Sequence, residues 1–181
     1  LRAAILALLC LLPVFPAVAG DVDADAELKA RLVGLVSEGK WVDALKAADA
    51  AIETCPESIV AWQYRAYSLH RIGRKDEAGA AYEKTVALDP KNWWAWLNLA
   101  ELRASQDRRE AAVKAAERAV ALHPKSVDVR TRVSRIHREA GEYELATAAA
   151  LMAFGAGVDP KWCHAELGYL FWVLGYAEKS R

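Results

Sequence analysis

A pattern that recurs every 34 residues constrains the fold of this chain more than any other feature. One slot of the pattern holds alanine in four successive copies, at Ala44, Ala78, Ala112 and Ala146. Another slot holds glycine or aspartate, at Gly39, Gly73, Asp107 and Gly141. A fixed period of this length is typical of stacked supersecondary units, each of which contacts mainly its neighbours. The repeats are therefore predicted to form one domain with no internal linker.

Each unit is predicted to be a pair of short antiparallel helices. In the unit 59–92, apolar residues fall three or four positions apart, at Trp62, Ala66, Leu69 and Ile72, which places them on one helical face. Gly73 breaks this run and Pro90 ends the next one, because proline lacks a donor N–H and disfavours helix in the residue before it. The predicted pairs are 25–38 with 41–54, 59–72 with 75–88, 93–106 with 109–122, and 127–140 with 143–156, followed by a helix at about 161–174.

The recurring alanine has a physical explanation. Two helices can approach to the lower end of the usual 8–10 Å spacing only where small side chains separate their backbones. The four alanines are therefore predicted to mark the crossing point of each helix pair.

This pattern resembles the tetratricopeptide repeat (TPR), in which tryptophan, small, aromatic and proline positions recur in each unit. The unit 59–92 carries the resemblance through Trp62, Ala66, Ala78, Tyr82 and Pro90. The resemblance implies an all-α fold, a right-handed superhelical solenoid of stacked antiparallel helix pairs with about four repeats plus a C-terminal helix. The expected repeats are 25–58, 59–92, 93–126 and 127–160, with a capping half-repeat at 161–181.

The last two units depart from the pattern. The proline of the fourth unit arrives late, at Pro160, so the stretch 155–157 is interpreted as a two-residue insertion. Beyond it, the first half of a fifth unit is matched by Leu167, Gly168, Phe171 and Gly175.

Residues 1–19 differ in composition from the rest of the chain. Arg2 precedes a short apolar run, and the small residues of 17–19 follow it. This order is typical of a secretory signal peptide, here cleaved before Gly20. Residues 20–24 are then expected to be an acidic linker, and 25–181 the repeat domain. The predicted location is extracytoplasmic, in the bacterial periplasm or cell envelope, and the alternative is a domain anchored by an uncleaved N-terminal segment.

The sequence offers little for chemistry. The chain has 24 basic and 24 acidic residues, so no overall field favours nucleic acid. The four histidines are dispersed over separate repeats, and no metal site, cofactor or small-molecule substrate is expected. Cys163 is the only plausible nucleophile, and it lies three repeats from Cys55, too far for a disulfide in a solenoid. The protein is therefore predicted not to be an enzyme.

The resemblance also implies a binding surface, because in this family the first helix of each pair lines a concave face. The residues so placed, and predicted to form a peptide-binding groove, are Gln63, Tyr64, Tyr67, Arg71, Trp94, Asn98, Glu101, Arg132, Arg135 and Arg138. Aromatic rings give a large contact area at low entropic cost, and guanidinium groups suit carboxylates. The expected partner is a protein or peptide with an apolar anchor and an acidic segment or a free C-terminus.

A less specific interpretation of the arginines remains open. Arg132, Arg135 and Arg138 would then form a solvated face, balanced by Asp128, Glu139 and Glu142.

The C-terminal helix is unusually aromatic for the end of a repeat array, where the outer face is normally polar. Its Leu167, Phe171 and Leu174 are expected to pack on the fourth repeat. The opposite side would then carry a possible self-association patch, made of Trp162, Tyr169 and Trp172. The alternative function is thus a structural envelope protein that self-assembles through this helix, a possible homo-oligomer.

Overall fold

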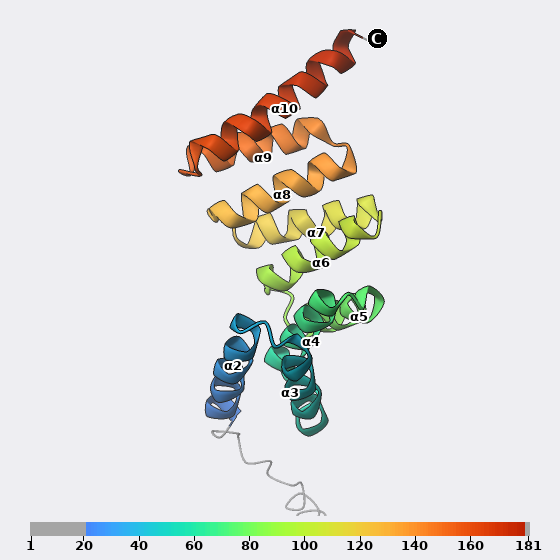
Figure 1. Cartoon of the computed structure of the whole chain (residues 1–181), viewed down its shortest axis with the longest axis vertical. Coiled ribbons are helices and arrows are strands. Elements are labelled where there is room, and N and C mark those ends of the chain that lie inside the picture. Colours follow the sequence, from blue (N-terminus) through green and yellow to red (C-terminus); the bar gives the residue numbers. More distant parts are fainter. Residues whose placement is uncertain (1–20, 180–181) are drawn as a thin grey trace, which may run out of the picture.

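The computed structural model describes the backbone of residues 21–179 and the side chains of residues 25–175. Every regular element in this range is an α-helix, and the helices are α2 (Asp21–Ser37), α3 (Trp41–Thr54), α4 (Ile59–Ile72), α5 (Lys75–Leu88), α6 (Trp93–Ser105), α7 (Arg109–Leu122), α8 (Val127–Ala140), α9 (Tyr143–Gly155) and α10 (Pro160–Lys179). They stack in chain order from α2 at one end to α10 at the other (Figure 1). The predicted signal peptide lies outside the described residues. Within 21–179, no helix has both the length and the apolar character needed to cross a membrane.

The predicted helix pairs are confirmed, with two differences at the ends of the array. The first helix begins at Asp21, so residues 21–24 of the acidic linker expected at 20–24 belong to α2. Acidic sequence suits the first turn of a helix, where the macrodipole favours negative charge. The last helix continues to Lys179 and is longer than the helices before it. Figure 1 shows α10 reaching past the end of α9.

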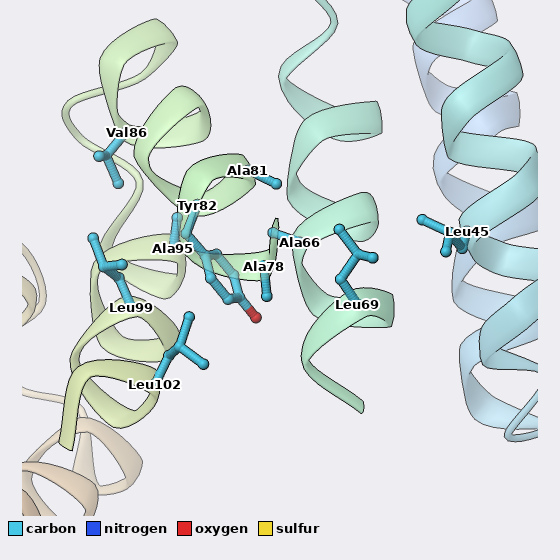
Figure 2. Packing of buried hydrophobic residues seen from close by; sticks show 10 residues of the cluster. All are labelled: Leu45, Ala66, Leu69, Ala78, Ala81, Tyr82, Val86, Ala95, Leu99 and Leu102. Carbon is cyan, nitrogen blue, oxygen red and sulfur yellow. The ribbon is translucent and has the colours of Figure 1, made fainter. Parts of the chain in front are cut away.

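The alanines at the predicted crossing points are buried in all four pairs. Ala44, Ala78 and Ala146 have no exposed surface, and Ala112 is 1% exposed. In the second pair, Ala66 of α4 supplies the other small side chain, and Figure 2 shows Ala66 and Ala78 in the space between α4 and α5. The recurring alanine is therefore the contact that allows each pair of helices to pack closely.

The recurring glycine slot ends the first helix of each pair. Gly73 has a φ of +92°, and its N–H donates to His70 O while the N–H of Arg74 donates to Leu69 O. This Schellman geometry needs a left-handed residue, which glycine adopts without steric cost. Asp107 holds the same slot after α6 with a φ of +57°, and aspartate is among the few other residues that tolerate it.

The fourth pair ends differently from the others. The second helices α3, α5 and α7 each end at a residue with a φ near −135°, namely Cys55, Asp89 and His123. By contrast, α9 ends in a left-handed turn at Gly157, and the N–H of Val158 donates to Ala153 O. The insertion expected at 155–157 is thus accommodated by a glycine turn before α10.

The repeat tryptophans are tied to the repeat prolines. Nε1 of Trp62 donates to Pro56 O at 2.8 Å, and Nε1 of Trp96 donates to Pro90 O at 3.1 Å. Each indole therefore fixes the turn that enters its own repeat, which explains why the two residue types recur together.

The array curves with its first helices on the inner side. Contacts run directly from α2 to α4, from α4 to α6 and from α6 to α8. In the described part of the chain, the second helices α3, α5 and α7 make no comparable contact with one another. The second helices therefore splay apart on the outer side, and side chains of α4, α6 and α8 line a concave face.

Candidate functional site

The concave face holds an open pocket of about 500 Å³ between α4, α6 and α8. The lining residues are Tyr67, His70, Arg71, Trp94, Asn98, Glu101, Asp128, Arg132 and Arg135. Seven of them belong to the groove predicted from the sequence. Peptide binding by these residues stays a prediction, but the fold does bring them together.

A second, more apolar pocket of about 470 Å³ adjoins the first. It is lined by Val33, Val36, Ser37, Gln63, Tyr64, Tyr67, Trp93 and Trp94. The two pockets share Tyr67 and Trp94, so they form one groove with an apolar half and a polar half. Gln63 and Tyr64, also predicted groove residues, lie in the apolar half.

Aromatic rings connect the two halves. The Tyr67 ring lies 5.8 Å from the Trp41 ring and 5.3 Å from the Trp94 ring. On its other side, Trp94 lies 6.3 Å from the buried ring of Tyr82. The guanidinium of Arg71 lies 4.9 Å from the centre of the Trp41 ring, within the range of a cation–π contact. These ring contacts restrict the side chains of Tyr67 and Trp94, the two aromatic residues that line both pockets.

Trp41 lines neither pocket, but it contacts Tyr67 and Arg71, and the sequence analysis gave it no role because only first-helix positions were considered. It is the first residue of α3, so it stands next to the turn that joins the helices of its pair. An aromatic residue directly after the recurring glycine turn is the signal that could have identified it.

The polar half is organised around Glu101. Nε of Arg132 donates to Oε1 of Glu101 at 2.8 Å, and Nη2 donates to Oε2 at 2.6 Å. Nη2 of Arg135 also donates to Oε1 of Glu101. Arg132 reaches the Asn98 amide oxygen at 3.2 Å and the Asp128 carboxylate at 3.5 Å. One carboxylate thus holds two guanidinium groups, one of them in the bidentate geometry that gives the strongest ion pairs.

These contacts fix the charge states in the groove. Burial raises the pKa of the Glu101 carboxyl, but the hydrogen bonds and charge of Arg132, with the charge of Arg135, outweigh burial and hold the pKa below its ordinary value. Burial lowers the pKa of His70, although Glu101 acts in the opposite direction. His70 is therefore neutral near pH 7, and the pocket carries three guanidinium groups against two carboxylates.

Arg138, the last of the predicted groove residues, lies in neither pocket. Its Nε donates to Oε1 of Glu166 at 3.0 Å, and its guanidinium lies 5.5 Å from the centre of the Tyr169 ring. The expected basic wall is therefore largely neutralised within the protein. The balancing carboxylates include Asp128, as expected, but the main ones are Glu101 and Glu166, while Glu142 instead contacts His137.

The C-terminal helix presents a different face from the one expected. Trp162 is not part of an exposed patch, because it packs with Leu167 against the cluster of Ala146, Ala150 and Leu170. Phe171, expected to pack inward, is 56% exposed. Leu170 has no exposed surface and lies in the buried cluster with α9, whereas Phe171 lies on a side of α10 that no described helix covers. Tyr169 and Trp172 are exposed, as expected.

The two described cysteines differ in exposure, Cys55 being exposed and Cys163 buried. Cys163 is 1% exposed, and burial raises the pKa of its thiol, which opposes a role as a surface nucleophile. Cys55 and Cys163 are both free in the structure. Within the described residues, no group of three His, Cys, Asp or Glu side chains could hold a metal ion.

Comparisons with known proteins agree with this architecture. The family model of the tetratricopeptide repeat matches residues 59–102 and 93–136. A crystal structure of MamA superposes with a TM-score of 0.72 at 20% identity, over 78% of this chain and 83% of that one. MamA residues 41 to the end from Desulfovibrio magneticus RS-1 give 0.71 at 15% identity, over 85% of each chain.

TTC0263, a thermophilic TPR protein of Thermus thermophilus, gives a TM-score of 0.68 at 18% identity, over 83% of each chain. No curated protein matches the sequence. Structural similarity at these identities establishes the fold alone and assigns no role to the groove residues.

Proposed function

We propose that this chain is a tetratricopeptide repeat protein and that it is an exported, non-catalytic scaffold, which holds an extended segment of a partner protein in its concave groove. The observation that carries the proposal is the continuity of the two pockets across Tyr67 and Trp94. A groove lined by aromatic rings, with charged groups at one end, is typical of a surface that binds another protein.

The partner chemistry follows from the two halves. The apolar half, with Val33, Val36 and Tyr64, suits an aliphatic or aromatic side chain of the bound segment. In the polar half, Arg132 and Arg135 are already paired, whereas no described carboxylate forms an ion pair with Arg71. Arg71 is therefore the group we expect to meet a carboxylate of the partner, either an acidic side chain or a free C-terminus.

Charge reversal at Arg71 tests this proposal. Arg71→Glu is expected to reduce capture of the partner from an envelope extract at least about tenfold, equivalent to roughly 1.4 kcal/mol of binding free energy. The side chain is exposed, so the folded structure should persist. Capture is measured by quantitative mass spectrometry of proteins retained on the immobilised chain, with circular dichroism to confirm folding.

Arg118→Glu provides a matched control on the outer face. Arg118 is also exposed and also lies over a tryptophan, 6.0 Å from the centre of the Trp96 ring. We expect this substitution to leave the retained proteins unchanged. Equal loss of capture with both variants would show that the groove does not carry recognition. Arg132 is a poor choice for this test, because its replacement would also leave Glu101 unpaired.

Export is the remaining part of the proposal, and the order of charged, apolar and small residues in 1–19 supports it. Protein produced from the complete coding sequence in a bacterial host is expected in the periplasmic fraction, with Gly20 as its first residue. Mass spectrometry of the intact purified protein measures the cleavage point. Retention of residues 1–19 in a membrane fraction would instead support the anchored alternative.

The second candidate, a structural protein that self-assembles through α10, is favoured by the exposed aromatic side chains of that helix. It does not compete with the groove for the same residues. A scaffold that also self-associates is therefore consistent with both surfaces, and substitutions can separate them.

A further inference from the structure

The helix α10 has the sequence of a first repeat helix, but it is not covered as the other first helices are. Gly168 follows Ala66, Ala100 and Ser134 at the 34-residue interval, and each of those three has no exposed surface. Gly168 is exposed, and no atom lies within 4 Å of the position that a Cβ would take. The next helix of the pair covers this position in the earlier repeats. Within the described residues, nothing takes its place on α10.

The neighbouring aromatic position shows the same difference. Phe171 occupies the repeat position that Leu69 and His137 hold in earlier repeats. Leu69 is fully buried and His137 is 6% exposed, whereas Phe171 is 56% exposed. On α9, Phe154 follows Val86, which is 8% exposed, but Phe154 is 50% exposed. The exposed face therefore corresponds to the surface that a second or following helix buries in the earlier repeats.

The same face of α10 also has the sequence spacing of a second repeat helix. In α5, Ala78 and Tyr82 stand four residues apart and pack against α4. Gly168 and Trp172 repeat this order of a small and then an aromatic residue. One face of α10 therefore carries two sets of packing residues. Gly168 with Phe171 corresponds to a first repeat helix, and Gly168 with Trp172 has the spacing of a second repeat helix.

We propose that two copies of the chain associate through α10, each α10 taking for the other the place that a second helix takes in the earlier repeats. The two helices lie antiparallel and cross at Gly168, where the absence of a side chain allows close approach. On either side of the crossing, Phe171 and Trp172 of each copy then pack beside Ala165 and His164 of the other. The contact is isologous, as expected for a two-fold dimer.

Charge and area are both compatible with this contact. Between residues 164 and 175, the only charged side chain is Glu166, and it is paired with Arg138 of α8. No like charges therefore meet when two α10 faces come together. Aromatic side chains have roughly 150–250 Å² each, so Phe171 and Trp172, which are 56% and 67% exposed, offer on the order of 250 Å² per copy. Two copies would bury on the order of 500 Å² from these two rings, and the side chains around them would supply the rest of the roughly 1,200 Å² of a small stable interface.

The test is the mass of the complete chain in solution, measured by sedimentation equilibrium over a range of concentrations. The wild-type protein is expected to be a dimer, and Gly168→Leu is expected to weaken dimerisation at least about tenfold. Leucine fits the open space on the monomer and favours helix over glycine, so the fold should be kept. Phe171→Glu is expected to give a monomer. Gly34→Leu is the matched control, because Gly34 also has no atom within 4 Å of its Cβ position and lies in α2.

Cross-linking identifies the contact directly. In a Cys55→Ser background, Gly168→Cys is expected to give a covalent dimer under mild oxidation. The two helices cross at this residue, which brings the two Cα atoms within the distance of about 7 Å that a disulfide needs. Gly34→Cys should give none. The proposal is overturned if the wild-type chain is monomeric at every concentration. It is also overturned if an oligomer forms that neither Gly168→Leu nor Phe171→Glu weakens.

Discussion

Tyr82→Ala is expected to lower the free energy of unfolding by about 3–5 kcal/mol, the usual cost of removing a buried aromatic side chain. The ring is fully buried and packs with Leu69 of its own repeat and with Leu99 and Leu102 of the next. Figure 2 shows it extending from α5 into the space beside α4 and α6. It therefore stabilises both a helix pair and the junction between two repeats.

The loss at that junction should also change how the protein unfolds. In a repeat array, cooperativity depends on the interfaces between neighbours. Chemical denaturation followed by circular dichroism is expected to show a lower midpoint and a smaller slope for Tyr82→Ala, because the two halves of the array become less tightly coupled. A decrease of less than about 1 kcal/mol would contradict the assignment of Tyr82 to a close-packed junction.

Tyr82→Phe, unlike Tyr82→Ala, is expected to stabilise the folded protein. The Tyr82 hydroxyl is buried and has no hydrogen-bond partner among the described residues, and burial raises the pKa of this phenol well above its ordinary value. Removing an unpaired buried hydroxyl while keeping the ring should raise the free energy of unfolding by about 1 kcal/mol. The same denaturation experiment measures it, with the wild-type chain as reference. A loss of stability would show that the hydroxyl is hydrogen-bonded in solution.

The fold was predictable because its determinants are local and repeated. The spacing of Ala44 and its equivalents fixed where helices cross, and Gly73 and Pro90 fixed where they end. These positions act within one repeat or between neighbours, so a 34-residue period carries nearly all of the necessary information. Even Asp107 was recognised from its register alone and adopts the left-handed conformation of the glycines.

The residues that line the groove could be predicted from the sequence, but the ion pairs among them could not. Register along the first helices identified Tyr67, Trp94 and Glu101, all of which line the pocket. It could not show that Glu101 is the carboxylate that neutralises Arg132 and Arg135, because the partners lie 31 and 34 residues apart. The pairing depends on the distance between adjacent first helices, a property of the assembled array and not of any one repeat.

The C-terminal helix was the least predictable element. The register matched it to a first repeat helix, which places Phe171 inward, where Leu69 lies in α4. In the structure, no described second helix covers that face, so the side chains facing α9 define the buried side. Sequence register therefore describes a helix correctly only when the neighbours implied by the register are present.

Glu101→Gln is expected to lower the free energy of unfolding at pH 7 by about 2–3 kcal/mol, somewhat less than the 3–5 kcal/mol typical of breaking a fully buried ion pair. The side chains of Glu101 and Arg132 are only 19% and 22% exposed, so water cannot fully solvate the guanidinium that loses its partner. Glutamine keeps the size and one acceptor oxygen, so the loss reports mainly on charge. Chemical denaturation of both chains at pH 7 measures the difference.

The difference in stability between the wild-type chain and Glu101→Gln should disappear as the pH is lowered. The pKa of Glu101 in the folded protein lies below its ordinary value of 4.5. A group with a lowered folded pKa contributes stability that is present above the unfolded value and lost as the pH falls through the folded value. The wild-type chain should therefore lose stability relative to Glu101→Gln as the pH falls below about 4.5, and the two should converge in stronger acid. A difference that is constant with pH would show that Glu101 acts through packing and not through its charge.

The Arg74–Glu77 pair supplies the control that separates burial from pairing. Its N–O distance is 2.6 Å, the same as between Arg132 and Glu101, but its side chains are about half exposed. Glu77→Gln should therefore change stability little, because exposed pairs are screened by water. Joint replacement of Glu101 by Gln and Arg132 by Met should recover much of the loss seen with Glu101→Gln, since no buried charge is left without a partner. That recovery would show that the Glu101–Arg132 pair adds little net stability compared with uncharged side chains of similar size.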